Sequence, residues 1–115
     1  MNVTNDYAKL RAMIAKYAPK GRAIPVIAGE WGYSAGWKNY DEAKQGERVT
    51  QHFTVNRDEK IPVTIWYDWH DDGTDPHEAE HHFGLVAHEK TGDEKQPYKP
   101  KPAYEAAKKF LLNSP

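Results

Sequence analysis

The sequence predicts an α/β protein organised around one strand–helix–strand unit. Two runs rich in β-branched residues, 23–30 and 61–68, have the length and the flanking glycines typical of buried strands, and a helix is predicted between them over 41–57. Strands that alternate with a helix in this order pair in parallel through a right-handed connection. We therefore expect the polar, aromatic residues that end both strands to lie at the same edge of one sheet.

A first helix is predicted over 5–18. Asn5 or Asp6 can cap its start, and Pro19 and Gly21 follow its end. Apolar side chains three or four residues apart form one stripe, which we expect to pack in the core. The stripe consists of Tyr7, Leu10, Ile14 and Tyr17.

The strand over 23–30 ends at Glu30, which stands between Gly29 and Gly32. These glycines let the backbone turn sharply around the acid, so the strand delivers one carboxylate to the edge of the sheet. Strict alternation divides the other side chains between two faces. It places Ile24, Val26 and Ala28 with Glu30, and Pro25 and Ile27 toward the helices.

The connection and helix that follow carry most of the remaining aromatic residues of this unit. Loops at the carboxyl ends of parallel strands commonly hold binding groups, and this one contains Trp31, Tyr33, Trp37 and Tyr40. The helix over 41–57 begins at Asp41 or Glu42, whose charge favours a helix N-terminus. Its inward stripe is Val49, His52, Phe53 and Asn56. We interpret His52 as a packed residue and not as a ligand.

The C-terminal part of the chain is predicted as a strand, a long loop and a helix. The strand over 61–68 contains Trp66 and ends at Asp68. Residues 69–100 lack periodicity and are rich in Asp, Glu, His, Gly and Pro, which favours a functional or disordered loop. Pro102 opens a last helix over 102–113. The apolar face of that helix is Ala103, Ala106, Ala107, Phe110 and Leu111.

Composition excludes several classes of function. The 115 residues allow one domain, and no segment has the apolar length of a membrane span. A net charge of −1 offers no general attraction for nucleic acid or anionic lipid, and the absence of cysteine excludes disulfides and thiolate chemistry. No cofactor motif is found. The N-terminus has neither a basic leader nor an apolar core, whereas export of a longer parent protein stays open, so no compartment is assigned.

The acidic and aromatic residues allow three interpretations. Four Trp and seven Tyr present flat apolar faces with polar edges, which suit oligo- or polysaccharide ligands, and a carboxylate at a strand end suits glycosidic chemistry. Asp68, Asp71 or Asp72 are candidates for a second carboxyl.

A metal site is the second interpretation, because acids and histidines crowd residues 70–82. Their spacing matches no ordered zinc or calcium motif, so no metal site is predicted. The third is a binding module without catalysis, held by Trp31, Trp37, Trp66 and Trp69.

Three motifs resemble the C-terminal part of clan A glycoside hydrolases, the cellulase-like retaining enzymes built on a (β/α)8 (TIM) barrel. They are Gly-Glu-Trp-Gly-Tyr-Ser at 29–34, Ile-Trp-Tyr-Asp-Trp-His-Asp-Asp-Gly-Thr-Asp-Pro at 65–76 and Glu-His-His-Phe-Gly-Leu-Val at 80–86. The likeness extends to Lys-Pro-Ala-Tyr at 101–104, which is similar to the start of the last barrel helix.

The resemblance implies specific roles for the strand ends. The two strands correspond to the seventh and eighth barrel strands, and the active sites of such barrels sit at their carboxyl ends. Glu30 takes the place of the catalytic nucleophile, and Trp66 that of the tryptophan that floors the sugar subsite. The expected substrate-binding residues are Trp31, Tyr33, Trp37, Trp66 and Asp68.

The chain also departs from that family. The acid/base glutamate of the clan follows an asparagine, and no Asn-Glu pair occurs here, although retention requires two carboxyls about 5 Å apart. A full barrel needs about 250 residues, so a quarter to half of a barrel is predicted, completed by a homo-oligomer or a swapped dimer; a fragment of a longer product is the alternative. The expected function is a glycoside-hydrolase-like fragment, inactive or weak alone. The alternative is a non-catalytic carbohydrate-binding or self-assembly module.

Overall fold

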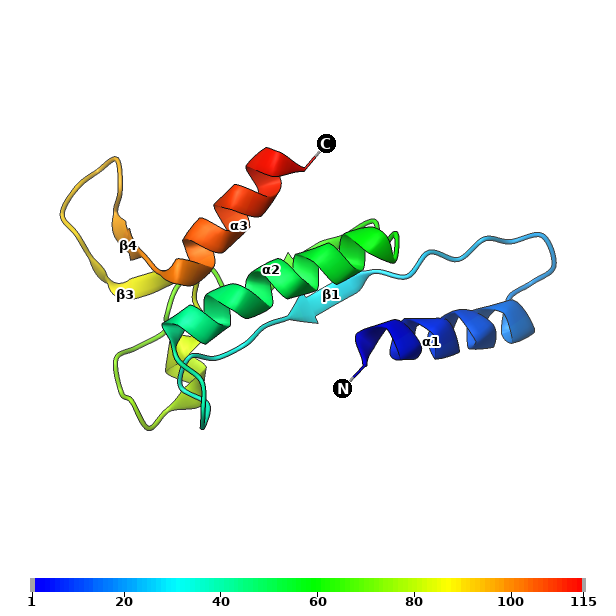
Figure 1. Cartoon of the computed structure of the whole chain (residues 1–115), viewed down its shortest axis with the longest axis horizontal. Helices are drawn as coiled ribbons and strands as arrows, with labels where there is room; N and C mark the ends of the chain where they lie inside the picture. The colour runs from blue at the N-terminus through cyan, green and yellow to red at the C-terminus, as the bar shows by residue number, and fades with distance from the viewer. Residues whose placement is uncertain (1, 115) are drawn as a thin grey trace.

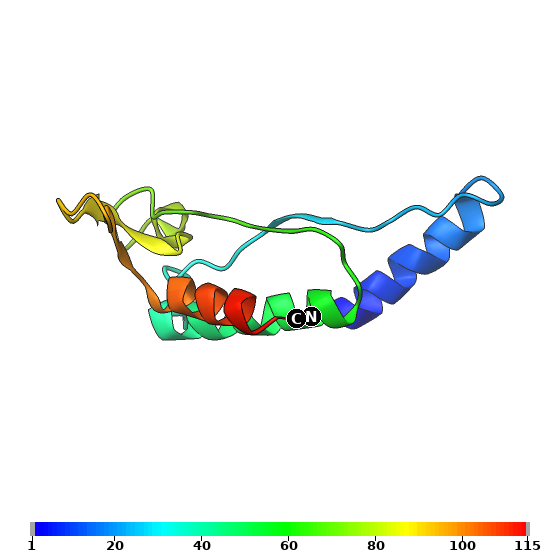
Figure 2. The same ribbon diagram turned by 90° about the horizontal axis from the view of Figure 1, so that it is seen from above.

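The computed structural model describes residues 2–114 as a mixed α/β chain with two small sheets. The elements in chain order are α1 (Val3–Tyr17), β1 (Ala28–Trp31), α2 (Glu42–Asp58), β2 (Thr64–Trp66), the 3₁₀ helix η1 (Ala79–His82), β3 (Val86–Lys90), β4 (Tyr98–Pro100) and α3 (Pro102–Asn113). Helices α2 and α3 lie side by side, and α1 extends toward the opposite end of the molecule (Figure 1). Figure 2 shows α2 and α3 in one layer, with the strands on one side of it, while α1 slants out of that layer.

Strands β1 and β2 pair in parallel, which confirms the predicted strand–helix–strand unit. Ala28 is paired with Thr64, and Trp31 with Trp66, so the carboxyl ends of both strands lie at the same edge. Both strands are shorter than the predicted ranges 23–30 and 61–68. Each has a single partner among the described residues, so only the segments that face each other form a hydrogen-bonded ladder.

The predicted faces of β1 are wrong because the strand is irregular between Ala28 and Trp31. Val26 and Ala28 pack on the helix side, in a cluster with Tyr7 and Ile61. A bulge adds a residue and breaks the period of two, and Trp31 therefore returns to the helix side, where its ring centroid lies 3.6 Å from that of His52. Glu30, just before it, is exposed.

The face of the β1–β2 sheet away from α2 is open and apolar. Thr64 and Trp66 contact α2, so by alternation Val63 and Ile65 project from the other face; they are 45% and 51% exposed. The side chain of Ile27, predicted to face the helices, is 56% exposed. The radius of gyration is 16.7 Å, whereas a compact domain of this size has about 13 Å. The exposed side chains show that the sheet is covered on one face only, and the large radius of gyration agrees with an open arrangement.

Helix α1 contributes less to the core than its apolar stripe predicts. Its start is capped by Asn2, whose side chain accepts from the Asn5 amide at 3.3 Å, and not by Asn5 or Asp6. Tyr7 is its buried residue, while Leu10 and Tyr17 are exposed. The reason is visible in Figure 1, where the later turns of α1 run past the end of the sheet.

A buried polar network joins α1, α2 and β2 around Asn56. The Asn56 carbonyl accepts from the Tyr7 hydroxyl at 2.6 Å, and its amide donates to the Thr64 hydroxyl and to Nε2 of His52, both at 2.8 Å. This bond requires a neutral His52 that keeps Nε2 free of a proton. Burial lowers the pKa of His52 from 6.5 to about 4. His52 is therefore a packed residue on α2, as the sequence predicts.

We expect the free energy of unfolding to fall as the pH is lowered from about 6.5 to about 4. In this window the unfolded chain binds a proton at His52 that the folded chain rejects, and below pH 4 both forms are protonated. The full loss is about 3 kcal/mol. Urea unfolding at pH 7.5 and pH 4.5 measures it. In His52→Gln this part of the pH dependence should disappear, while in the exposed control His77→Gln it should persist; equal pH dependence in wild type and His52→Gln would contradict the assignment.

The segment 69–100 is not a single loop. It contains η1 and the antiparallel pair β3–β4, in which Val86 is paired with Pro100 and Lys90 with Tyr98. The prediction of a loop is wrong for β3 and β4, because these short strands close a local hairpin, which leaves no clear periodicity to detect.

Helices α2 and α3 form the second core cluster. Val49, Ala103 and Ala107 are buried there, with Phe53 and Trp66 against them. A Cβ atom added at Gly46 would lie 3.1 Å from the backbone of Pro102, so this glycine lets the two helices approach closely. None of the described helices is long and apolar enough to cross a bilayer.

Candidate functional site

A cavity of about 360 Å³ opens beside Glu30 at the carboxyl edge of the β1–β2 sheet. This volume lies in the range of about 300 to 1,000 Å³ that small-molecule sites occupy. Its wall comes from the end of β1, from the residue after β2 and from the segment of η1. The lining residues are Glu30, Trp31, Gly32, Trp37, Tyr67, Glu80 and Phe83.

Gly32 brings the chains that follow β1 and β2 into direct contact. A Cβ atom at this position would lie 2.0 Å from the carbonyl oxygen of Tyr67, so any larger residue would push the two segments apart. The Tyr67 amide donates to the carbonyl of Trp31 at 2.7 Å. The spacing of Glu30 and Tyr67 across the cavity is therefore set by backbone packing.

Aromatic rings form one side of the cavity. The Phe83 ring meets Trp37 edge-on at a centroid distance of 5.4 Å and Tyr67 at 5.3 Å, which is the preferred geometry for aromatic pairs. Partial desolvation raises the pKa of the Tyr67 hydroxyl, and the nearby carboxylates, Glu80 first among them, raise it further. Tyr67 therefore keeps its proton at neutral pH and can donate a hydrogen bond into the cavity.

The predicted binding residues divide between this cavity and other places. Trp31 and Trp37 line it. Tyr33 instead stacks with Tyr40 at 6.1 Å and lies under the guanidinium of Arg48. These three residues line a second cavity of about 380 Å³ between the start of α1 and α2.

Trp66 and Asp68 do not line the cavity beside Glu30. Trp66 is turned toward the helices, with its ring 6.2 Å from that of Phe53. The Asp68 carboxylate accepts from the amide of Trp69, and its backbone amide donates to the carbonyl of Phe83 at 3.2 Å. The exposed ring of Trp69 lies 6.3 Å from Tyr104, also away from the cavity.

The sequence analysis missed Tyr67, Glu80 and Phe83 as lining residues. The signal for Tyr67 is alternation along β2, because a residue that follows a helix-facing Trp66 must point to the opposite face. No periodic signal places Glu80, which lies in the segment that composition assigns to a loop.

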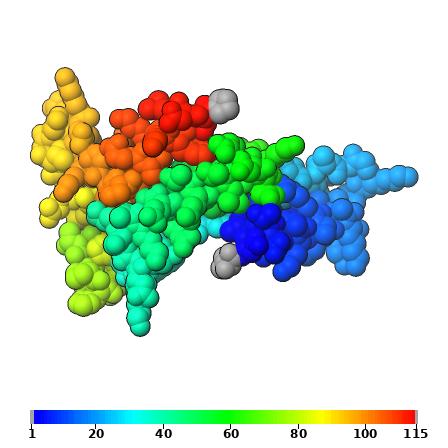
Figure 3. Space-filling view, viewed as in Figure 1, coloured from blue at the N-terminus to red at the C-terminus, as the bar shows by residue number. Residues whose placement is uncertain are grey.

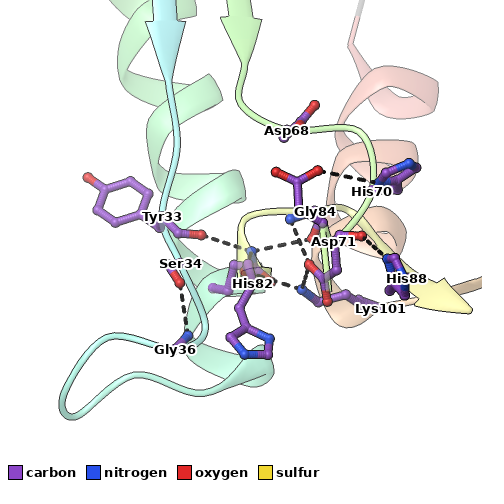
Figure 4. Close-up of polar contacts among 12 residues, drawn as sticks. Tyr33, Ser34, Gly36, Asp68, His70, Asp71, His82, Gly84, His88 and Lys101 are labelled. Atoms are coloured by element: carbon purple, nitrogen blue, oxygen red, sulfur yellow. Dashed lines mark hydrogen bonds and ion pairs between the residues drawn. The ribbon is translucent and has the colours of Figure 1, made fainter. Parts of the chain in front are cut away.

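A buried ion pair supports the loop that carries η1 (Figure 4). Nζ of Lys101 lies 2.8 Å from Oδ1 of Asp71, and their side chains are 2% and 8% exposed. The same carboxylate oxygen accepts from the Gly84 amide at 2.8 Å. Asp71, a sequence candidate for the second carboxyl, is thus held in a structural pair. Asp72, another candidate, is exposed and lies 3.9 Å from Nδ1 of His70.

Two histidine side chains in and after the acid-rich segment form hydrogen bonds to backbone carbonyls. Nε2 of His82 donates to the carbonyl of Asp75 at 2.7 Å, and Nδ1 of His88 donates to that of Asp71 at 2.9 Å. Between residues 2 and 114 the structure contains no group of three or more metal-ligating side chains in an arrangement that would hold an ion.

The fold of this chain is similar to part of a solved glycoside hydrolase structure. A family 39 glycoside hydrolase from the gut symbiont Bacteroides cellulosilyticus WH2 matches 93% of this chain with a TM-score of 0.72 and 23% sequence identity. The match covers 21% of that protein, so the chain spans about a fifth of its length. No protein-family model and no curated protein sequence matches the chain. The assignment to clan A stays a prediction.

Proposed function

We propose that the chain is a segment of a retaining glycoside-hydrolase-like barrel in which Glu30 is the nucleophile. The observation that carries the proposal is the position of Glu30, which lines a cavity with aromatic walls at the carboxyl edge of two parallel strands. Active sites of TIM barrels are built at that edge. The shared fold with a family 39 glycoside hydrolase supports this choice over other uses of a carboxylate.

In this proposal three of the lining residues have a role in the reaction. A Glu30 carboxylate oxygen attacks the anomeric carbon and forms a glycosyl ester, while the leaving oxygen takes a proton from a second carboxyl group. Trp37 and Tyr67 offer apolar ring surface to the sugar. Tyr67, and not the helix-facing Trp66, then provides the aromatic surface contributed by the end of β2.

The proposed reaction also needs a second carboxyl group as acid/base. The Asn-Glu pair that would supply an acid/base is absent from the sequence. We propose that one chain alone is inactive or weak, and that a group from outside the chain protonates natural leaving groups. The alternative, a non-catalytic sugar-binding module, needs only the aromatic wall.

We further propose that copies of this chain complete the barrel. Ile27, Val63 and Ile65 form an open apolar face on the β1–β2 sheet, and in a barrel that face is the packed interior. Both outer edges of this two-stranded sheet are unpaired within the described residues, and unpaired edges are templates for strands of another chain. Assembly would satisfy both features at once.

Sugar binding by calorimetry tests the site itself. Titration with cellotetraose and xylotetraose should give binding that Trp37→Ala weakens about tenfold, because the substitution removes one aromatic face of the cavity. Trp69→Ala is the matched control, since this exposed tryptophan lies outside the cavity. Equal losses in the two variants, or binding of neither sugar, would contradict a carbohydrate site beside Glu30.

A further inference from the structure

We propose that Glu80 is a specificity-determining residue of the Glu30 cavity, where its carboxylate contacts the ligand and selects uncharged or amino sugars over acidic sugars. This inference rests on the proposed function. Glu80 lines the same cavity as Glu30, although it lies on η1 and far along the chain.

The backbone around Glu80 is fixed by buried side chains. The Ser34 hydroxyl donates to the carbonyl of Ala79 at 2.6 Å, and the Gln45 amide donates to the carbonyl of His82 at 3.1 Å. Both Ser34 and Gln45 are fully buried. These bonds flank Glu80 on both sides, so its position at the cavity rim does not depend on a mobile loop.

The cavity carries negative charge without a compensating cation. Its lining contains the carboxylates of Glu30 and Glu80 and no lysine, arginine or histidine. Asp68 and Asp72 also act on the Tyr67 hydroxyl, together with Glu30 and Glu80. The potential inside the cavity is therefore negative, and it disfavours a uronate while it favours an ammonium group.

The size of the effect follows from Coulomb's law. A carboxylate about 6 Å from a ligand charge, in the intermediate dielectric of a cavity rim, changes affinity about five- to tenfold at low salt. Salt at about 1 M shortens the Debye length to about 3 Å and should reduce the difference. Removal of the Glu80 carboxylate should change the affinity for an uncharged sugar only through lost hydrogen bonds.

The test compares three probes by NMR titration at pH 6 and low salt: methyl β-D-glucopyranoside, its 2-amino-2-deoxy analogue and its uronic acid. Wild type should bind the amino sugar best and the uronate worst. Glu80→Gln should narrow the ratio of the amino-sugar affinity to the uronate affinity about five- to tenfold for each of the two ligand charges. Glu80→Lys should narrow it further, because the new ammonium group offsets the remaining carboxylate of Glu30. Glu78→Gln, which removes a neighbouring exposed charge outside the cavity, should leave the ratio nearly unchanged.

The outcomes separate this inference from the proposed function. If wild type binds the uncharged glucoside and Glu80→Gln keeps the full discrimination, the role of Glu80 is overturned and the sugar site stands. If wild type prefers the uronate, the role of Glu80 is also overturned. If wild type binds none of the three sugars, both ideas fail together.

Discussion

Glu30→Gln is expected to abolish covalent labelling of the protein by 2-deoxy-2-fluoroglycosyl fluorides. The fluoride leaving group departs without a proton, so the first step needs the nucleophile but no acid/base. Loss of a nucleophile costs several orders of magnitude, and we expect the labelling rate to fall at least about 1,000-fold. Intact-mass spectrometry over time measures the rate.

Asp68→Asn is the matched control for this variant. Asp68 ends the second predicted strand, but its carboxylate accepts from the Trp69 amide and lies outside the cavity lining. Its labelling rate should stay within a few-fold of wild type. Labelling that persists in Glu30→Gln would show that Glu30 is not the nucleophile. Sugar binding by wild type and Glu30→Gln without labelling of either would favour the non-catalytic module.

Ile65→Asp is expected to dissociate the proposed assembly of copies of this chain. The side chain is 51% exposed in the single chain and would be buried between copies. Burying an unpaired carboxylate costs several kcal/mol, so the dissociation constant should rise at least about 100-fold. Light scattering after size-exclusion chromatography should show wild type as a multimer of the 13.2 kDa chain and the variant as a monomer.

Leu112→Asp provides the comparison for the assembly experiment. Leu112 is also exposed and apolar, but it lies near the end of α3 and not on the open sheet face. We expect this variant to keep the wild-type mass. A well-folded wild-type monomer at micromolar concentration would contradict the proposed assembly.

The order and type of the larger elements could be predicted from the sequence. The parallel pairing of β1 and β2 follows from two β-branched runs separated by a helix, and the structure confirms it. The faces of β1 could not be predicted, because the irregularity between Ala28 and Trp31 depends on how the chain packs against His52 and Tyr67. The apolar stripe of α1 was expected in the core, but most of it is not buried. Periodicity shows that one face of a helix is apolar, but not whether a neighbouring element covers that face.

The candidate site could be predicted only where it follows from strand ends. Trp31 and Trp37 were expected near Glu30 and line its cavity. Trp66 was expected beside Glu30 from the parallel pairing of the strands, and its role came from the resemblance, whereas its ring is turned toward α2. Glu80 is positioned by hydrogen bonds from Ser34 and Gln45, residues distant in sequence, to the flanking carbonyls of Ala79 and His82. Tertiary contacts of this kind leave no signal in local spacing.

The most direct test is a crystal structure of the protein after reaction with a 2-deoxy-2-fluoroglycosyl fluoride. The proposed role of Glu30 predicts continuous density from one of its carboxylate oxygens to the anomeric carbon, with the sugar ring in contact with Tyr67 and Trp37 and with Glu80 facing the ring. Density for the sugar on another carboxylate, or in the cavity beside Tyr33 and Arg48, would contradict it.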